Sequence, residues 1–467
     1  MLDGKDRMMR ILFVNPPWVK RDGNVWKNIA CVMPPLGLAW MASVLEKHGH
    51  QVLICDAHAE RLPMDQIANS LAQLGHFDLV GITATTPIIS NALEIARQAR
   101  RLWPACRLVM GGVHPTVLPD ETLAEPAVDV VVRGEGEITI TDLAAHTPFA
   151  EIRGISYRQA GKIIHNPDQI LIEDLDSLPM PAYHLLPMDK YYPSAGAAKR
   201  LPAVSMLATR GCPGRCTFCY RIFGNKLRVR SGRKVAEEVK HLQDTYGIKE
   251  ICFYDDTFTV FKKEVHAFCQ RLEELHVNLT WSCFSRVDTI DQLLLDDMKA
   301  HGCHQIMYGI ESASPEILAN VGKRADLDKA RRAVAITKKA GIDVRAAYML
   351  GNPGETLETM QQTLDFAIEL DTDVAIFNIA TPFPGTDMFQ WAKSRGLLTT
   401  ENWDEYDFAN PVMKLPTVSL KQIHEFYQRA YRKFFLRPKY LARRVARLRH
   451  LVSVVDAFRG LRAVMNT

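Results

Sequence analysis

Three cysteines in one short loop are the residues of this chain best placed to carry chemistry. Cys212, Cys216 and Cys219 are separated by three and then by two residues in the segment ATRGCPGRCTFCY. Because so little backbone separates them, the three sulfurs can converge on one soft metal centre, and three close thiolates favour an iron–sulfur cluster with one iron left without a protein ligand. A structural zinc site would need a fourth Cys or His nearby, and none follows within this loop. Three unligated thiols are the remaining interpretation.

The residues around this loop resemble the radical S-adenosylmethionine (SAM) superfamily. The loop follows the apolar run VSMLAT, and Phe218 directly precedes the third cysteine. The resemblance implies that Cys212, Cys216 and Cys219 hold a 4Fe–4S cluster and that the amino and carboxylate groups of SAM fill the open iron site. It also implies that one electron cleaves SAM to a 5′-deoxyadenosyl radical.

Six strand–helix units, from about residue 196 to 390, are expected to position the loop. The expected strands are VSMLAT, EICFYDD, NLTWSCFS, HQIMYGIES, DVRAAYMLG and DVAIFNIA. The helices between them have apolar residues at helical spacing, such as Val235, Val239 and Leu242. Six units predict a partial (β/α)6 TIM-like barrel that is open on one side to a large substrate. In parallel barrels the chemistry lies at the C-terminal ends of the strands.

Polar residues gather at those strand ends, and the resemblance assigns several of them to SAM. Arg324 resembles a family arginine that holds the SAM carboxylate, a role that suits a bidentate guanidinium. The segment GNPGET resembles the family's turn near the adenine. For any single acid, a helix cap or an ion pair explains the residue equally well, whereas the ordered series of matches makes coincidence implausible. The SAM-binding candidates are Tyr254, Asp255, Asp256, Glu311, Arg324, Gly351 and Pro353.

The first part of the chain, about residues 8 to 150, is expected to form a doubly wound parallel sheet. Apolar strands such as RILFVNPP and DLVGITATT alternate with amphipathic helices. Ligands of such sheets lie beyond the carboxyl ends of the strands, where glycines permit close approach of a flat molecule. The segments PPLGLAWMASVLEKHGHQV, GGVHPTVLP and VVRGEGE resemble the cobalamin-binding domain found ahead of many radical SAM cores. The resemblance implies cobalamin contacts from Thr83, Gly111, Gly112, His114, Gly134 and Glu135.

One departure from the cobalamin pattern concerns His58. Domains that supply a histidine below the cobalt carry DxHxxG, but Asp56-Ala57-His58 is followed by Ala59, Glu60 and Arg61. We therefore expect His58 to be a surface or strand-end residue and the cobalt to have no histidine below it. A plain flavodoxin-like or response-regulator domain is the alternative for this half. No acidic cluster follows the first strand and no Gly-rich phosphate loop opens a helix, so nucleotide binding is poorly supported.

Composition narrows the class of protein. The 467 residues suffice for two or three domains, and 47% hydrophobic with 24% charged residues is ordinary for a soluble globular protein. The sequence has no apolar run of about 18 residues and no signal-peptide pattern. Ten cysteines in such a chain fit a reducing compartment, so we expect a cytoplasmic protein. Without a second Cys-rich motif, we expect one iron–sulfur cluster.

The remaining segments are a linker and a helical tail. Residues 151–195 are rich in Pro and Asp and include the hairpin-like GISYRQAGKIIHN, and residues 391–467 are expected to be helical. From Arg429 onward, eleven Lys and Arg residues stand against one acid. A basic amphipathic helix beginning near Pro438 could cap the barrel, lie on an anionic membrane or bind RNA, and the lack of interleaved aromatics disfavours nucleic acid. Its expected apolar face is Leu441, Val445, Leu448, Val452 and Val455, beside Arg443, Arg444, Arg447 and His450.

Together these features predict a cobalamin-dependent radical SAM methyltransferase acting on a small-molecule or lipid-like substrate. In that branch of the family, one SAM methylates cob(I)alamin, and the radical made from a second SAM removes hydrogen from an unactivated carbon, which then captures the methyl group. A flavodoxin- or ferredoxin-type reductant is implied. Two alternatives stay open. One is cyclisation or rearrangement without methyl transfer, as in the anaerobic cyclase of chlorophyll synthesis. The other is a non-catalytic cobalamin or redox sensor, against which the full set of strand-end residues argues.

Overall fold

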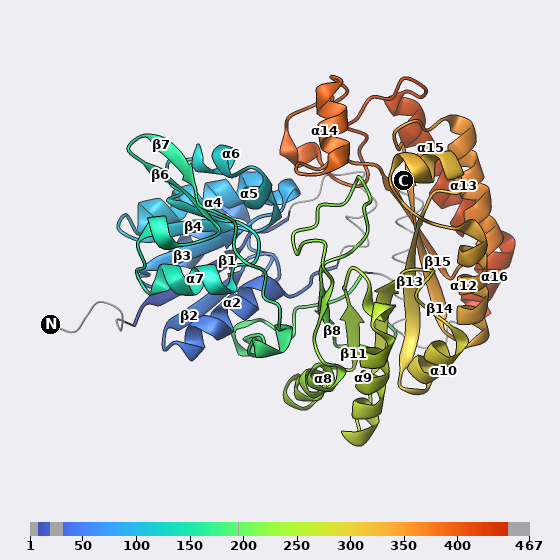
Figure 1. Ribbon diagram of the computed structural model, residues 1–467, viewed down its shortest axis with the longest axis horizontal. Helices are drawn as coiled ribbons and strands as arrows, with labels where there is room; N and C mark the ends of the chain where they lie inside the picture. Colours follow the sequence, from blue (N-terminus) through green and yellow to red (C-terminus); the bar gives the residue numbers. More distant parts are fainter. Residues whose placement is uncertain (1–7, 19–30, 195, 447–467) are drawn as a thin grey trace.

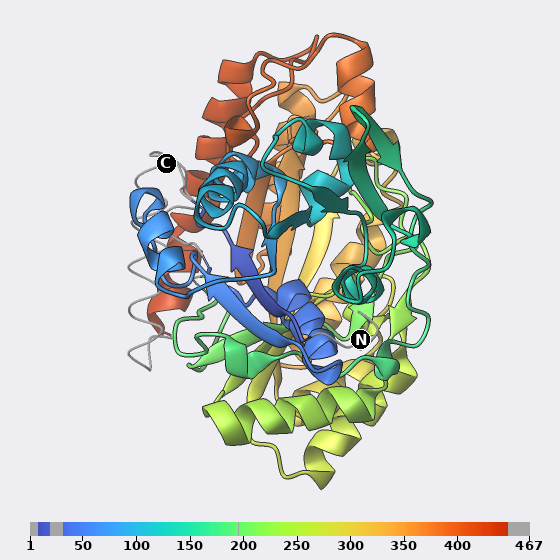
Figure 2. The ribbon, with the colours of Figure 1, turned by 90° about the vertical axis from the view of Figure 1, so that its left-hand side faces the viewer.

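The computed structural model describes residues 8–18, 31–194 and 196–446. Figure 1 shows two α/β domains facing each other, the N-terminal domain on the left and a larger, curved domain on the right. In Figure 2 the N-terminal domain lies in front of the larger one. No helix among the described residues is long and apolar enough to cross a membrane.

The N-terminal domain is built on one sheet in the order β2-β1-β3-β4-β5-β6-β7. Strands β1 to β5 are parallel, whereas β6 and β7 form an antiparallel hairpin on the edge strand β5. The hairpin comes from the segment expected to act only as a linker, and it extends this sheet instead. The strands are β1 (Arg10–Asn15), β2 (Gln51–Asp56), β3 (Leu79–Thr83), β4 (Arg107–Gly111), β5 (Val130–Val132), β6 (Ile155–Gln159) and β7 (Lys162–His165).

Helices cover both faces of this sheet, as expected for a doubly wound domain. Successive residues of β1 point to opposite faces, so Leu12 packs in a core with α3 and α4, whereas Phe13 packs in a second core with α2 and α7. The helical segments are α2 (Leu36–Lys47), α3 (Met64–Ala72), η1 (Thr86–Ile88), α4 (Ile89–Leu102), α5 (Val113–Val117), α6 (Pro119–Leu123), α7 (Glu137–Ala144) and η2 (Phe149–Glu151).

The larger domain is a half-barrel of six parallel strands in the order β15-β14-β13-β12-β11-β8. This confirms the predicted partial (β/α)6 barrel. The strands are β8 (Ala203–Met206), β11 (Glu250–Phe253), β12 (Thr280–Ser285), β13 (Cys303–Glu311), β14 (Asp343–Leu350) and β15 (Val374–Ile379). The helical segments that follow them are α8 (Gly232–Tyr246), η5 (Phe258–Val260), α9 (Lys262–Glu274), α10 (Gln292–Ala300), α11 (Pro315–Asn320), α12 (Leu327–Lys339) and α13 (Leu357–Leu370).

The remaining described segments join the domains and close the end of the barrel. The Tyr431 hydroxyl donates to the Phe377 carbonyl of β15, and Arg443 pairs with Asp371 at 2.8 Å. The described start of the basic tail therefore packs on the barrel, while residues 447–467, with Leu448, Val452, Val455, Arg447 and His450, lie outside the described residues. The segments are η3 (Leu175–Ser177), η4 (Tyr183–Leu185), α14 (Asp387–Ser394), η6 (Trp403–Glu405), α15 (Leu420–Phe435) and α16 (Pro438–Ala446).

Candidate active site between the two domains

The cysteine loop leaves the first barrel strand and is closed by a short two-stranded ribbon. Strands β9 (Thr209–Arg210) and β10 (Arg228–Val229) pair antiparallel on either side of the loop. Within the loop, the Gly214 N–H lies 3.4 Å from Cys212 Sγ. A Cβ at Gly214 would lie 3.3 Å from Cys212 Sγ and 4.0 Å from Cys216 Sγ. The two sulfurs therefore flank a position that has no side chain.

The three loop thiols fit an iron–sulfur cluster better than zinc. All three are free cysteines. Tetrahedral zinc, with Zn–S bonds of about 2.3 Å, would hold sulfurs only about 3.8 Å apart. Among the described residues, Cys269, Asp297 and His301 on α9 and α10 have ligand atoms that all lie within 4.8 Å of one another. The three loop sulfurs do not lie this close together. The wider spacing suits an iron–sulfur cluster that takes three thiolates from the protein.

Charged residues gather around these thiols. Burial raises the pKa of Cys216, against the opposing effect of Lys323. Desolvation of the Cys219 thiol by the surrounding protein raises its pKa to about 12, and the neighbouring Cys216 and Glu311 add to this effect. Lys323 Nζ lies 3.1 Å from Glu311 Oε1, and both side chains are largely buried. Burial lowers the pKa of Lys323, but Glu311 and Cys216 outweigh burial and raise it, so the ammonium stays charged beside the loop.

Lys323 is a residue of this region that the sequence interpretation missed. Arg324, the predicted partner of the SAM carboxylate, is exposed, whereas its neighbour Lys323 lies among the cysteines and Glu311. The sequence therefore predicted a cation in the correct turn. In the structure, however, the side chain beside the cysteine loop is that of the adjacent residue, Lys323. The role of Arg324 stays a prediction.

Asp255 has a defined structural part in holding the loop. Its Oδ1 accepts hydrogen bonds from the backbone N–H groups of Ala208, at 2.8 Å, and Thr209. Its Oδ2 is buried without a hydrogen-bond partner, and burial raises the pKa of the carboxyl to about 7. Asp255 thus fixes the entry of the loop, whereas its neighbour Asp256 is exposed. Contact of either carboxyl with SAM stays a prediction.

The GNPGET turn is held by its own hydrogen bonds. Gly351 has φ +80°, in the left-handed region that favours glycine. The Asn352 N–H donates to Glu355 Oε2 at 2.7 Å, and the Asn320 amide donates to the Pro353 carbonyl at 3.2 Å. Thr356 then forms the capping box of α13. The segment therefore begins a helix while lying at the carboxyl end of β14.

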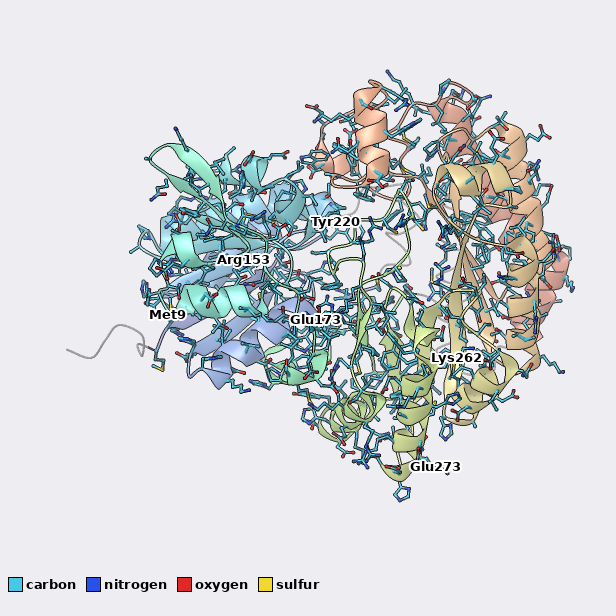
Figure 3. All side chains as sticks on the ribbon, viewed as in Figure 1. Met9, Arg153, Glu173, Tyr220, Lys262 and Glu273 are labelled. Carbon is cyan, nitrogen blue, oxygen red and sulfur yellow. The ribbon has the colours of Figure 1, made fainter. Side chains whose placement is uncertain are left out.

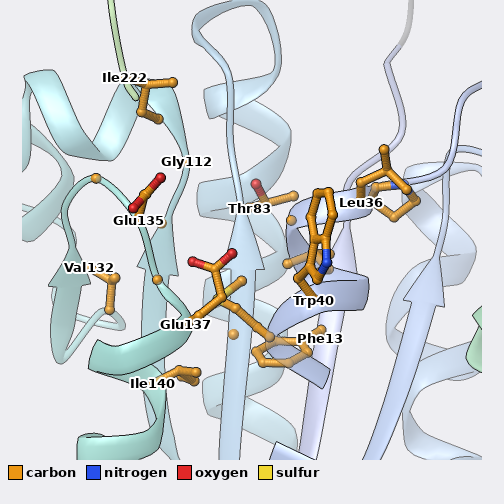
Figure 4. Close-up of a pocket in the computed structure, with 18 of the residues that line it drawn as sticks. Phe13, Leu36, Trp40, Thr83, Gly112, Val132, Glu135, Glu137, Ile140 and Ile222 are labelled. Carbon is orange, nitrogen blue, oxygen red and sulfur yellow. The ribbon is translucent and has the colours of Figure 1, made fainter. Parts of the chain in front are cut away.

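A cavity of about 220 Å³ lies at the carboxyl ends of the N-terminal strands (Figure 4). Thr83, Gly111 and Val132 line it from the ends of β3, β4 and β5, and Trp40 lines it from α2. Residues of the larger domain complete it, and they flank the cysteine loop in sequence. These are Leu207, Arg210, Ile222 and Phe223.

The glycines around this cavity are required by close contacts. Gly112 has φ +97°, and a Cβ there would lie 2.7 Å from the Ala84 carbonyl oxygen and 2.9 Å from Thr83 Oγ1. A Cβ at Gly136 would lie 2.6 Å from Met41 Sδ. Side chains at these positions would displace neighbouring residues that form or border the cavity wall, and the glycines leave the strand ends open to part of a bulky ligand such as cobalamin.

Glu135 lines the cavity and also joins the two domains. Its carboxylate lies 2.8 Å from Arg228 Nη2 and 3.2 Å from Arg210 Nη1, and all three side chains are buried. Arg210 also pairs with Glu137 at 2.5 Å and lies over the Trp40 ring at 4.8 Å. Burial raises the pKa of Glu135, but Arg228, the Ile172 N–H and Arg210 outweigh it and hold that pKa below its usual value.

Two histidines singled out by the sequence lie away from this cavity. His114 is buried, with Nδ1 3.3 Å from Thr86 Oγ1 and its ring edge-on to Trp403 of the larger domain. His58 follows the edge strand β2, and its Nδ1 accepts a hydrogen bond from the Trp18 N–H at 3.2 Å. Neither residue lines the cavity. A cobalamin contact from His114 stays a prediction.

Comparison with known proteins matches both halves of the chain. The B12 binding domain model matches residues 25–144, and the radical SAM superfamily model matches residues 206–367. An uncharacterized methyltransferase of Pyrococcus horikoshii is 39% identical over 97% of this chain and 98% of its own length. The anaerobic magnesium-protoporphyrin IX monomethyl ester cyclase of Rubrivivax gelatinosus is 29% identical over 93% of this chain and 78% of its own.

A solved structure shares the architecture. The radical SAM methyltransferase TsrM of Kitasatospora setae, with cobalamin and a [4Fe-4S] cluster bound, has a TM-score of 0.69 at 21% identity, covering 85% of this chain and 76% of its own. The predicted order of a cobalamin-binding domain followed by a radical SAM core is confirmed. With the relative that matches almost its whole length, the chain belongs to the family of cobalamin-dependent radical SAM methyltransferases.

Proposed function

We propose that this protein transfers a methyl group to an unactivated carbon of a small organic substrate held between its two domains. When bound, cobalamin supplies the methyl group, and the cluster with SAM supplies the radical that removes hydrogen from the substrate carbon. Cys212, Cys216 and Cys219 would hold the cluster. The chain would bind these groups around one enclosed space and keep water from the reacting carbon.

The observation that carries the proposal is the shared lining of the inter-domain cavity. Arg210, two residues before Cys212, and Ile222, three residues after Cys219, line the same cavity as Thr83 and Gly112 at the N-terminal strand ends. Figure 3 shows Tyr220, directly after the last loop cysteine, between the two domains. A cluster held by the loop would therefore lie next to a ligand held at the strand ends.

The roles proposed for other residues follow from their positions. Gly111, Gly112, Thr83 and Gly134 line the cavity and would contact cobalamin. The pair formed by Lys323 and Glu311 lies beside the cysteines and would contact SAM, with the lysine suited to its carboxylate. Tyr254, Asp256, Gly351 and Pro353 stand at barrel strand ends, where SAM contacts are expected.

Product analysis of the reconstituted enzyme tests this function. The wild type and Cys216→Ala would be loaded anaerobically with iron, sulfide and hydroxocobalamin, then given SAM and a strong reductant. We expect S-adenosylhomocysteine from both proteins, because methyl transfer to cobalamin does not need the cluster, and 5′-deoxyadenosine from the wild type alone. Formation of 5′-deoxyadenosine without S-adenosylhomocysteine would favour cyclisation or rearrangement, the reaction class of the cyclase relative. Formation of neither would favour a sensor.

Electron supply and location complete the proposal. A flavodoxin- or ferredoxin-type protein would deliver the electron, because SAM cleavage consumes one per turnover. We place the enzyme in the cytoplasm and propose peripheral contact of the basic tail with anionic lipid, which the eleven Lys and Arg residues from Arg429 support. Cosedimentation with vesicles containing phosphatidylglycerol tests the contact, and a chain ending at residue 437 should lose it.

A further inference from the structure

Arg345 is a buried cation in the barrel that the proposed chemistry leaves without a role. It belongs to β14 and is 6% exposed. Across residues 8–18, 31–194 and 196–446, no hydrogen bond involves its guanidinium, and no carboxylate lies within ion-pair distance of it. Its Nε is buried without a partner, and burial lowers the pKa of the group. A buried charge without a partner is costly, so the arrangement calls for an anionic ligand.

The strand register places Arg345 on the inner face of the half-barrel. The neighbouring Ala346 pairs with Tyr308, whose hydroxyl contacts Thr337 of the outer helix α12. Alternation along the strand then turns Arg345 to the opposite, inner face. Gln305, two residues before Met307 on the inner face of β13, donates a hydrogen bond to the Gly196 carbonyl.

Arg345 is the far end of an inner layer that begins at the inter-domain cavity. Met307 pairs with Arg345 and with Phe284, and the Phe284 ring packs edge-on against Tyr254 at 4.9 Å. Tyr254 is level with Leu207, because Phe253 pairs with Met206, and Leu207 lines the cavity. Tyr254 follows β11, three strands away from β14. Its hydroxyl nevertheless has a larger electrostatic effect on the pKa of Arg345 than any other ionisable group. The sheet thus curves round one inner space.

No carboxylate among the described residues neutralises Arg345. The ionisable groups that influence its guanidinium are the Tyr254 hydroxyl and the thiols of Cys252 and Cys31, and none is a carboxylate. Burial raises the pKa of both Tyr254 and Cys252, so these groups are neutral at physiological pH. The positive charge at Arg345 therefore has no carboxylate counter-charge among the described residues, and Tyr254 and Cys252 beside it are uncharged.

We propose that Arg345 binds an anionic group, a carboxylate or a phosphate, carried by the methyl-accepting substrate; this inference rests on the proposed function. A guanidinium presents two parallel N–H donors that match either anion. The site would anchor the substrate inside the barrel while its reacting carbon points along the inner layer toward Leu207 and the cavity. Gly351, at the carboxyl end of β14, is six residues further on, about 20 Å at the usual rise per residue, so the anchor lies deeper than that turn.

Selenate, a tetrahedral oxyanion whose selenium scatters X-rays anomalously, is the probe that tests the anchor. Crystals of the holoenzyme would be soaked in selenate, and we expect an anomalous peak at hydrogen-bonding distance from Arg345 in the wild type. The peak should vanish in Arg345→Met and persist in Arg332→Met, which removes an exposed cation of α12. No peak beside Arg345 in the wild type would overturn the proposal. A peak that persists unchanged in Arg345→Met would overturn it too, because it would show an adventitious ion only.

Thermal unfolding supplies a second readout that separates an anchor from a structural residue. Without anions, Arg345→Met should unfold at a higher temperature than the wild type, because an uncompensated buried charge has been removed. Selenate should raise the midpoint of the wild type and of Arg345→Lys, and leave that of Arg345→Met unchanged relative to an equal concentration of chloride. A lower midpoint for Arg345→Met without anions would show that the guanidinium stabilises the fold and would overturn the proposal.

Equilibrium binding of SAM distinguishes the sources of the anion. We expect the dissociation constants of SAM for the wild type and Arg345→Met to agree within twofold. A tenfold weaker binding to the variant would identify the SAM carboxylate as the anion and overturn a substrate anchor. None of these readouts requires turnover. A failed methyl transfer would therefore refute the proposed function without refuting the anion site, and failure of anion binding would refute the site without refuting methyl transfer.

Discussion

The Glu135 carboxylate of the N-terminal domain lies 2.8 and 2.9 Å from two guanidinium nitrogens of Arg228 in the larger domain, and both side chains are buried. The two residues are 93 apart in the sequence, and Glu135 lines the cavity between the domains. A buried ion pair adds little net stability to a fold. Removal of one partner is strongly destabilising, because the other charge is left buried and unpaired. The pair therefore fixes how the two domains, and the ligands between them, are aligned.

Removing the charge of Glu135 should destabilise the enzyme. Glu135→Gln keeps the shape but leaves Arg228 and Arg210 short of a buried counter-charge, so we expect a loss of about 3 kcal/mol in the free energy of unfolding by urea. Asp244→Asn, which breaks the exposed pair between Lys240 and Asp244, should cost less than about 0.5 kcal/mol. Equal effects of the two substitutions would show that the buried pair does not hold the domains together.

A methyl group at Gly112 should weaken cobalamin binding. In Gly112→Ala the new Cβ would meet the Ala84 carbonyl oxygen and Thr83 Oγ1, so the strand end that lines the cavity must shift. We expect the dissociation constant of hydroxocobalamin to rise at least tenfold, equivalent to about 1.4 kcal/mol. Gly49→Ala is the matched control, because Gly49 also has a positive φ but a Cβ there meets nothing within 4 Å. The control should bind cobalamin as the wild type does.

The Asp255 carboxyl should make stability depend on pH. Its pKa is raised to about 7 in the folded protein, from an ordinary value of 3.8, because burial disfavours its charged form. The folded state thus holds more protons than the unfolded state between these values, and the contribution of Asp255 to stability falls as pH rises through this window. Asp255→Asn still accepts from Ala208 and Thr209 but cannot ionise.

The comparison of Asp255→Asn with the wild type between pH 6 and pH 8 checks this expectation. The difference in thermal midpoint, variant minus wild type, should increase as pH rises, because only the wild type must bury a charge there. A difference that stays constant across this range would show that Asp255 is already ionised in the folded protein at pH 6.

Much of this architecture follows from local patterns, whereas the contacts between distant segments do not. The expected strand EICFYDD corresponds to β11, Glu250–Phe253, because a buried parallel strand needs continuous apolar residues. Glu135 was singled out because it follows a strand, but nothing local shows that Arg228 neutralises it. The hairpin of β6 and β7 could be recognised, but not its register against β5. In the turn at Lys323 and Arg324, the backbone decides which side chain faces the cysteines.

Lys323 and Arg324 should differ in their effect on SAM. Lys323→Met removes a buried ammonium beside Cys216 and Glu311, so we expect SAM to bind at least tenfold more weakly. Arg324→Met removes an exposed cation and should change the dissociation constant of SAM less than twofold. Isothermal titration with the cluster-loaded proteins measures both constants. If Arg324→Met instead weakened SAM binding more than Lys323→Met, the partner of the SAM carboxylate would be Arg324, as the sequence predicts.

Replacing His58 should leave the cobalt centre unchanged. The ring accepts a hydrogen bond from the Trp18 N–H beyond the edge strand β2, whereas the cavity is lined from β1, β3, β4 and β5. The sequence also lacks the glycine of the DxHxxG pattern after His58. Electron paramagnetic resonance of the bound cob(II)alamin should therefore show no nitrogen hyperfine splitting from a protein histidine, and His58→Ala should give the same spectrum as the wild type. A nitrogen splitting that disappears in His58→Ala would mean that the N-terminal domain rearranges on binding cobalamin, since His58 does not line the cavity in this structure.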